Sequence, residues 1–228
     1  MTFRLKTPLS LCFDLDGTLI DTAPDLIRVL NTVIAQDGLS ETNFKAARLD
    51  VGYGSRKLIT EAFKRADQPI ATDRIDSLQK DFLRLYAEDI ARLSRPFPGV
   101  IDGLKSLKTQ GAYISVCTNK PGHLARSLIK TLNMEKLFIR VVGYDDVPHK
   151  KPNPAHIFRT VGHRHAHPIV MIGDSLPDIL AAKNAKVPSI AVSYGYSTIP
   201  AKKLGADAVI RNFRDLPSAL DCVLKTAP

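Results

Sequence analysis

Leu9-Ser10-Leu11-Cys12-Phe13-Asp14-Leu15-Asp16-Gly17-Thr18 places two carboxylates directly after a short apolar run. The run is typical of a buried β-strand, and ligands of open α/β sheets bind beyond the carboxyl ends of the strands. Two carboxylates this close repel each other, and a hard cation such as Mg²⁺ relieves the repulsion. A surface turn rich in Asp and closed by Gly17 is the alternative interpretation. Residues 9–18 therefore predict the first strand of a sheet, with either a ligand site or a plain turn at its end.

Short apolar runs rich in β-branched residues recur after residue 110 and alternate with helical patterns. The strand-like runs lie at 112–117, 138–142, 169–172, 188–192 and 208–210. Helical stripes of apolar residues lie at 100–107, 124–132, 157–161 and 216–224. Strands that alternate with helices predict an α/β fold, with a Rossmann-like parallel sheet and helices on both faces.

Residues 22–95 interrupt this alternation, because they contain no convincing strand. Apolar residues at helical spacing predict three helices there, around 26–34, 58–63 and 75–86. The segment Pro96-Phe97-Pro98-Gly99 that follows is typical of a linker or hinge. We therefore predict a core domain formed by residues 1–21 and 96–228, with an inserted all-helical domain at 22–95.

Composition restricts the classes of partner. The net charge is +9, from 32 Lys and Arg against 23 Asp and Glu, and the basic residues are scattered. This charge either favours an anionic small molecule or reflects a generally basic surface with no specific partner. The sequence has no aromatic-interleaved basic motif for nucleic acid. No apolar run has the length of a membrane span, no signal-peptide core precedes residue 10, and three widely spaced Cys are no disulfide framework. A cytoplasmic monomer or homodimer is expected.

Polar side chains follow two further strands, and a lysine precedes a helix between them. Thr118-Asn119-Lys120 follows one strand, Gly173-Asp174-Ser175-Leu176-Pro177-Asp178 follows another, and Lys151-Pro152 lies between them in sequence. Together with 14–18, these segments resemble, in order and context, the four motifs of the haloacid dehalogenase superfamily. The resemblance covers residues 10–216, and its first motif is the most specific. It implies that the inserted helices are a cap domain.

The resemblance also implies a reaction. Asp14 would be the nucleophile that forms an aspartyl-phosphate, and Asp16 would be the acid–base partner. Mg²⁺ would be held by the carboxylate of Asp14, the backbone carbonyl of Asp16 and Asp174. A halide leaves without a proton but an alkoxide does not, so an acid at Asp16 favours phosphate ester cleavage over dehalogenation.

The remaining site residues are also implied by the resemblance. Thr118 and Lys151 would bind the phosphoryl oxygens. Asp178 and Ser175 would orient Lys151 or the waters of the metal, although Pro177 departs from the polar residue common before Asp178 in the superfamily. The expected substrate contacts are Gly17, Thr18, Asn119 and Arg56.

Several stretches, among them 16–25, 118–121 and 143–152, resemble bacterial phosphoglycolate phosphatases in particular. A small phosphate ester with a carboxylate, 2-phosphoglycolate, is therefore the expected substrate, and Arg56 is either its carboxylate ligand or a solvated side chain. Tyr144 departs from the usual small residue and is expected to line the entrance. The alternatives are a pyrophosphatase, a sugar-phosphate phosphatase, a phosphosugar mutase or a non-catalytic binding protein. The His-rich residues 163–167 are expected to form a solvated loop.

Overall fold

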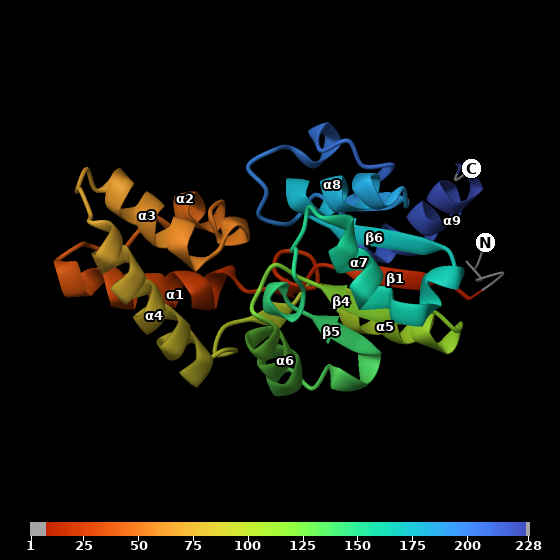
Figure 1. Ribbon diagram of the computed structural model, residues 1–228, viewed down its shortest axis with the longest axis horizontal. Helices are drawn as coiled ribbons and strands as arrows, with labels where there is room; N and C mark the ends of the chain where they lie inside the picture. Colours follow the sequence, from red (N-terminus) through yellow and green to blue (C-terminus); the bar gives the residue numbers. More distant parts are fainter. Residues whose placement is uncertain (1–7, 227–228) are drawn as a thin grey trace.

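The computed structural model describes residues 8–226, apart from the side chains of residues 165, 166 and 226. A parallel sheet of six strands forms its core, in the order β5-β4-β1-β6-β7-β8 (Figure 1). Ser10 pairs with Tyr113 on one side and with Ile169 on the other, which puts β1 in the middle. The strands are β1 (Ser10–Phe13), β4 (Tyr113–Cys117), β5 (Arg140–Val142), β6 (Ile169–Gly173), β7 (Ser189–Val192) and β8 (Ala208–Ile210). All the strands predicted from the sequence are therefore confirmed.

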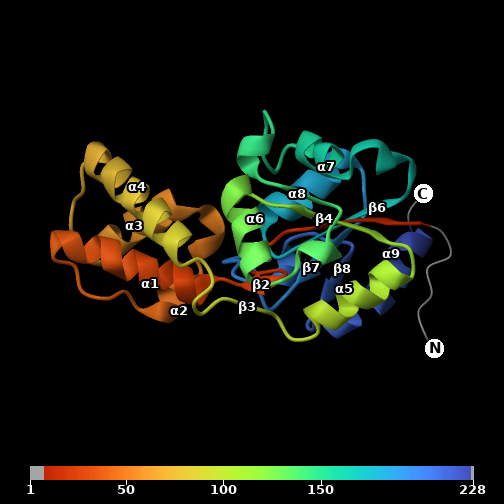
Figure 2. The same ribbon diagram turned by 90° about the horizontal axis from the view of Figure 1, so that it is seen from below.

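Helices cover both faces of this sheet, as predicted (Figure 2). On one face α7 (Pro154–Val161) and α8 (Leu176–Ala185) pack against a cluster that includes Cys12. On the other face lie α5 (Val100–Thr109) and α9 (Leu216–Thr226), whose apolar residues join the cluster of Leu11 and Phe13. Helix α6 (Gly122–Thr131) packs beside β5. Side chains alternate along a strand, so β1 contributes to both clusters.

The inserted segment forms a separate helical group beside the carboxyl ends of the strands (Figure 1). The three predicted helices correspond to α1 (Ala23–Ile34), α3 (Ser55–Arg65) and α4 (Thr72–Glu88). A short helix, α2 (Phe44–Arg48), was not predicted, because Ala47 is its one buried residue and it shows no apolar stripe. Its start is capped by Asn43, whose side chain accepts a hydrogen bond from the Ala46 N–H. Across the described residues, no helix combines the length and apolar character needed to cross a bilayer.

Two very short strands join the helical group to the core. β2 (Ile20–Asp21) pairs antiparallel with β3 (Arg95–Pro96), where the chain leaves the core and returns to it. Strands of two residues leave no periodic pattern, so the sequence did not indicate them. Nearby, the buried Asp25 of α1 accepts hydrogen bonds from the N–H groups of Leu93 and Ser94, at 2.8 and 2.7 Å. The β2–β3 pair and the hydrogen bonds of Asp25 support the proposed domain boundaries near residues 22 and 95.

Short 3₁₀ helices connect the main elements, at Ala35–Asp37, Val51–Tyr53, Glu135–Leu137, Tyr144–Asp146, Gly162–Ala166, Ala201–Lys203 and Phe213–Asp215. The His-rich stretch, expected to be a loop, is thus largely 3₁₀ helix. His163 is exposed there, and the ring of His167 stacks on Tyr113 at 5.3 Å.

Candidate active site

The predicted site residues meet at the carboxyl ends of three neighbouring strands. Asp14 follows β1, Thr118 follows β4, and Asp174 follows β6. After Asp14 the chain turns sharply, since the N–H groups of Leu19 and Ile20 both bond to the carbonyl of Leu15. The centre of the sheet and this turn therefore bring residues far apart in the sequence into one place.

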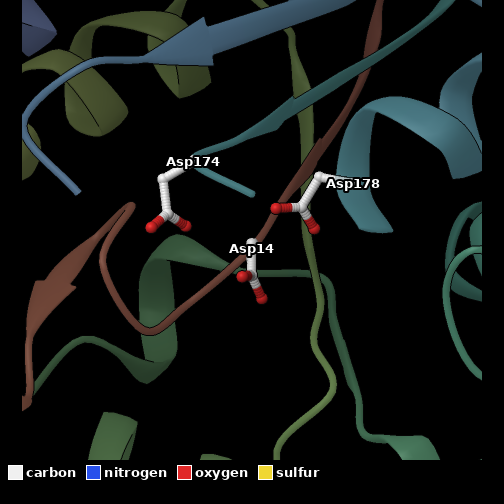
Figure 3. Close-up of side chains that lie close together, drawn as sticks. All are labelled: Asp14, Asp174 and Asp178. Carbon is white, nitrogen blue, oxygen red and sulfur yellow. The ribbon is translucent and has the colours of Figure 1, made fainter. Parts of the chain in front are cut away.

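Three carboxylates converge at this point, those of Asp14, Asp174 and Asp178 (Figure 3). One oxygen of each lies within 4.8 Å of the others, and each residue is at most 9% exposed. Burial raises the pKa of Asp14 to about 6, with Asp178 and Asp16 adding to burial and Lys151 opposing it. Burial and the neighbouring Asp14 raise the pKa of Asp174 to about 8. The cluster thus holds more negative charge than its neighbours neutralise, and its hard oxygen donors fit Mg²⁺.

Asp174 is fixed from both sides. Its Oδ1 accepts a hydrogen bond from the Thr18 hydroxyl at 3.1 Å, and its Oδ2 accepts one from the Tyr196 N–H at 2.7 Å. Gly17 and Gly195 pack so closely on its carboxylate that a Cβ at either position would collide with it. The position of the Asp174 carboxylate is therefore set by packing as well as by hydrogen bonds.

Lys151 lies between two members of the carboxylate cluster. Its Nζ is 2.6 Å from Asp178 Oδ1 and 3.0 Å from Asp14 Oδ1, and the residue is 2% exposed. Burial alone would lower the pKa of Lys151, but the two carboxylates outweigh it and raise the pKa above its ordinary value. The second oxygen of Asp178 accepts hydrogen bonds from the Ser175 N–H and hydroxyl. Asp178 is thus committed to Lys151 and Ser175, which leaves Asp14 and Asp174 as the carboxylates that fit a metal directly.

His156 accepts a hydrogen bond from the backbone of Lys151, and the sequence did not indicate this contact. Its Nδ1 accepts a hydrogen bond from the Lys151 N–H at 3.3 Å, and its Nε2 is 3.2 Å from the carbonyl oxygen of Val142. Burial and the nearby Lys151 lower the pKa of His156 to about 4, so the ring is neutral at neutral pH. The neutral ring then donates through Nε2–H and accepts at Nδ1, which matches both partners.

The four residues expected to contact the substrate do not all face the cavity. The hydroxyl of Thr18 is buried against Asp174, and Gly17 packs on the same carboxylate, so neither is turned toward the cavity. Asn119 lines the cavity, and its side-chain N–H donates to the Lys151 carbonyl at 3.1 Å. Arg56 pairs with Asp76 in a neighbouring groove, which Tyr144 also lines.

Lys120 is the clearest residue that sequence reasoning missed. Its Nζ lies 3.2 Å from both carboxylate oxygens of Asp16 and 4.5 Å from the ring centre of Tyr86, which comes from α4. Lys120 is 7% exposed and Tyr86 is 1% exposed. The one signal in the sequence was that Lys120 lies two residues after Thr118, near the end of a strand. Its contacts with Asp16 and Tyr86 depend on the folded structure.

A small cavity of about 80 Å³ lies beside Asp14, Asp16, Asp174 and Lys120, and Lys151 lines the adjoining groove. Core residues form the floor of the cavity, among them Asp14, Asp16, Thr118 and Asp174, and residues of the inserted helical segment form its roof. The roof consists of Leu26, Val51, Gly52, Gly54, Ser55, Leu58, Phe82, Leu83 and Tyr86. The carboxylates of Asp14, Asp16 and Asp174 thus border one enclosed space between the sheet and the inserted helices.

Tyr196 links Asp174 to the start of α1. Its hydroxyl accepts from the N–H groups of Thr22 and Ala23, at 2.7 and 3.0 Å, and donates to Asp21 at 2.5 Å. We expect Tyr196→Phe to lower the free energy of unfolding by about 1–3 kcal/mol, because it leaves two N–H groups at the start of α1 without an acceptor. Urea denaturation measures this loss.

Tyr194→Phe is the matched control, since the Tyr194 hydroxyl makes a single hydrogen bond, to the carbonyl of Thr18 at 3.0 Å. Its loss should be smaller than that of Tyr196→Phe. Equal losses in the two variants would show that the contact with α1 carries no special weight.

The raised pKa values of Asp14 and Asp174 predict how Mg²⁺ acts at different pH. Without metal, the folded protein keeps protons on these carboxyls above their usual pKa of 3.8, so stability falls as pH rises from about 4 to about 8. Mg²⁺ needs the carboxylates deprotonated, so its apparent affinity should rise by about tenfold per pH unit over pH 6 to 8. The increase in Tm on adding Mg²⁺ should therefore be larger at pH 8 than at pH 6. A Tm increase that is the same at both pH values would contradict the metal assignment to these carboxylates.

Comparisons with known proteins bear on this geometry. The sequence profile described as "Haloacid dehalogenase-like hydrolase" matches residues 11–192, which include every carboxylate of the cluster. The chain belongs to the haloacid dehalogenase-like hydrolases. A curated phosphoglycolate phosphatase from Caulobacter vibrioides is 42% identical over 221 residues, covering 96% of this chain and 93% of its own. Another, from Agrobacterium fabrum, is 39% identical over 222 residues, covering 96% and 95%.

Solved structures share the fold of this chain. A crystal structure described as a predicted phosphoglycolate phosphatase from Haemophilus somnus superposes with a TM-score of 0.84 at 28% identity, covering 92% of this chain and 96% of its own. A structure of CbbY from Rhodobacter sphaeroides, at 22% identity and a TM-score of 0.75, is similar in fold. These comparisons confirm the predicted fold and the predicted class of enzyme, a phosphatase.

Proposed function

We propose that this phosphatase hydrolyses 2-phosphoglycolate to glycolate and phosphate, through an aspartyl-phosphate on Asp14. The observation that carries the proposal is the meeting of Asp14, Asp16 and Asp174 at one cavity, with the Nζ of Lys151 3.0 Å from Asp14 Oδ1. Relatives that match most of the chain at 42% and 39% identity are named phosphoglycolate phosphatases, which supports this substrate.

Each residue has a role in the proposed reaction. The Asp14 carboxylate attacks phosphorus, the ester P–O bond breaks, and protonated Asp16 gives its proton to the leaving alkoxide. Asp16 then takes a proton from water, which attacks the phosphorus of the aspartyl-phosphate and releases phosphate and free Asp14. Lys151 and Thr118 hydrogen-bond to the phosphoryl oxygens, where negative charge concentrates in the transition state.

Mg²⁺ is the proposed cofactor, held by Asp14, Asp174 and the backbone carbonyl of Asp16. When bound, it supplies positive charge that offsets the repulsion between the Asp14 carboxylate and the phosphate. Thr18 and Tyr196 orient Asp174, and Asp178 and Ser175 orient Lys151, through the hydrogen bonds described above. Metal binding thus adds charge to a site whose side chains are already held in place.

Steady-state kcat/KM values over a panel of phosphates test the substrate. The panel contains 2-phosphoglycolate, 2-hydroxyethyl phosphate, pyrophosphate and a hexose phosphate, each with Mg²⁺ and with EDTA. We expect 2-phosphoglycolate to have the highest kcat/KM and activity to disappear with EDTA. Hydrolysis of pyrophosphate or the hexose phosphate at about tenfold higher kcat/KM would contradict the proposal.

A further inference from the structure

We propose that Lys120 binds the carboxylate of the substrate and thereby determines the specificity of the site. This inference rests on the proposed function, because it explains how a carboxylated phosphate ester is selected. It also gives to Lys120 a role that the sequence had indicated for Arg56.

Charge inside the cavity is the first argument. Among the described residues that line it, the carboxylate and ammonium side chains are those of Asp14, Asp16, Asp174 and Lys120. A second anionic group on the substrate would face three carboxylates, which is strongly unfavourable without a cation beside it. Lys151 is already held by Asp14 and Asp178 and serves the phosphoryl group. Lys120 pairs with Asp16, but among the described residues it is the cationic side chain that lines this space and can face a substrate carboxylate.

The position of Lys120 relative to Asp16 is the second argument. Asp16 must reach the ester oxygen of the leaving group in order to protonate it, and the Lys120 Nζ is 3.2 Å from both Asp16 oxygens. In 2-phosphoglycolate a single methylene separates the ester oxygen from the carboxylate carbon. A carboxylate so close to the ester oxygen must lie near Asp16 when Asp16 protonates that oxygen. The Lys120 ammonium, which contacts Asp16, is therefore near the substrate carboxylate.

Hydrogen-bonding capacity is the third argument. An ammonium group has three N–H donors, and Asp16 and the face of the Tyr86 ring are the partners that the structure gives it. Asp16 is 16% exposed at its side chain, so the pair borders the cavity and is not sealed from it. A substrate carboxylate can therefore share the ammonium with Asp16. The ring of Tyr86 in α4 contacts the ammonium on the other side, so Lys120 lies between the inserted helices and Asp16 of the core.

Arg56 is placed less well for the same task. It pairs with Asp76, its side chain is 46% exposed, and it lines the neighbouring groove instead of the cavity that contains Asp14. A carboxylate bound there would share the guanidinium with Asp76 at an exposed position. Arg56 therefore provides the rival variant in the experiment.

The experiment compares 2-phosphoglycolate with 2-hydroxyethyl phosphate, which has a hydroxymethyl group in place of the carboxylate. We expect Lys120→Met to lower kcat/KM for 2-phosphoglycolate by about 10²-fold more than for 2-hydroxyethyl phosphate. The preference for the carboxylated ester should persist in Arg56→Ala and partly in Lys120→Arg. p-Nitrophenyl phosphate, whose leaving group needs no proton, reports on the phosphoryl chemistry in each variant.

Three outcomes would overturn the inference, and they differ in meaning. Equal losses on the two esters in Lys120→Met would mean that Lys120 only positions Asp16. A preference lost in Arg56→Ala and kept in Lys120→Met would assign the carboxylate to Arg56. A wild-type enzyme that shows no preference between the two esters would remove the proposed function as well.

Binding without turnover gives a second readout if Lys120→Met folds poorly. In Asp16→Asn, which lacks the acid, the Kd values of the two esters can be measured by calorimetry with Mg²⁺. We expect about tenfold or tighter binding of 2-phosphoglycolate, because the Lys120 ammonium stays in place. Equal Kd values would overturn the inference independently of the kinetic result.

Discussion

Asp14→Asn should lower kcat/KM by about 10⁴-fold or more, because the amide cannot attack phosphorus. The fold should not suffer, since burial already raises the pKa of Asp14 to about 6 and a neutral amide removes a charge that the site disfavours without metal. We therefore expect the Tm of the metal-free variant to equal or exceed that of the wild type. Paired kinetic and thermal measurements separate loss of the nucleophile from loss of the structure.

Asp221→Asn is the matched control for this substitution. Asp221 is exposed and pairs with Lys225 in α9, on the surface, so its activity should stay within about twofold of the wild type. Asp14→Asn that keeps more than about a tenth of the wild-type activity would exclude Asp14 as the nucleophile.

Lys151→Met should have the second-largest effect, on stability as well as on activity. The phosphoryl group loses its cation, which should lower kcat by about 10²- to 10³-fold. In the metal-free protein the variant also leaves Asp178, which is fully buried, without its charge partner. Removal of one member of a buried ion pair costs about 3–5 kcal/mol, and urea denaturation measures this change.

A second substitution tests the cause of the destabilisation. Asp178→Asn in the Lys151→Met background removes the stranded charge and should restore part of the stability but none of the activity. Lys150→Met, next in sequence but exposed, should change the free energy of unfolding by less than about 0.5 kcal/mol. No recovery in the double variant would mean that Lys151 stabilises the fold through its packing and not through its charge.

The fold and the chemical centre could be predicted because their signals are local. Each strand is a short apolar run, and Asp14, Thr118 and Asp174 each follow such a run directly. In a parallel sheet the carboxyl ends lie along one edge, so position in the sequence implied proximity in space. The helices α1, α3 and α4 have apolar stripes, whereas α2 is too short to have one.

The remaining features depend on contacts between distant segments. Lys120 meets Asp16 over 104 positions of chain and meets a ring from α4, and no local pattern indicates either contact. Thr18 was expected to touch substrate, but its hydroxyl is buried on Asp174, 156 positions away. Arg56 was expected either to bind a substrate carboxylate or to be solvated, and in the structure it is 46% exposed at its side chain and pairs with Asp76. Side-chain partners of this kind are decided by tertiary packing, which the sequence pattern does not report.

The covalent intermediate on Asp14 is the central claim, and rapid-quench trapping tests it most directly. The enzyme is mixed with Mg²⁺ and radiolabelled 2-phosphoglycolate, quenched in acid within one turnover, digested and analysed by mass spectrometry. We predict a phosphoryl group on the peptide that contains Asp14, released by hydroxylamine and absent from Asp14→Asn. Single-turnover release of phosphate with no label on that peptide, at any quench time, would contradict the account.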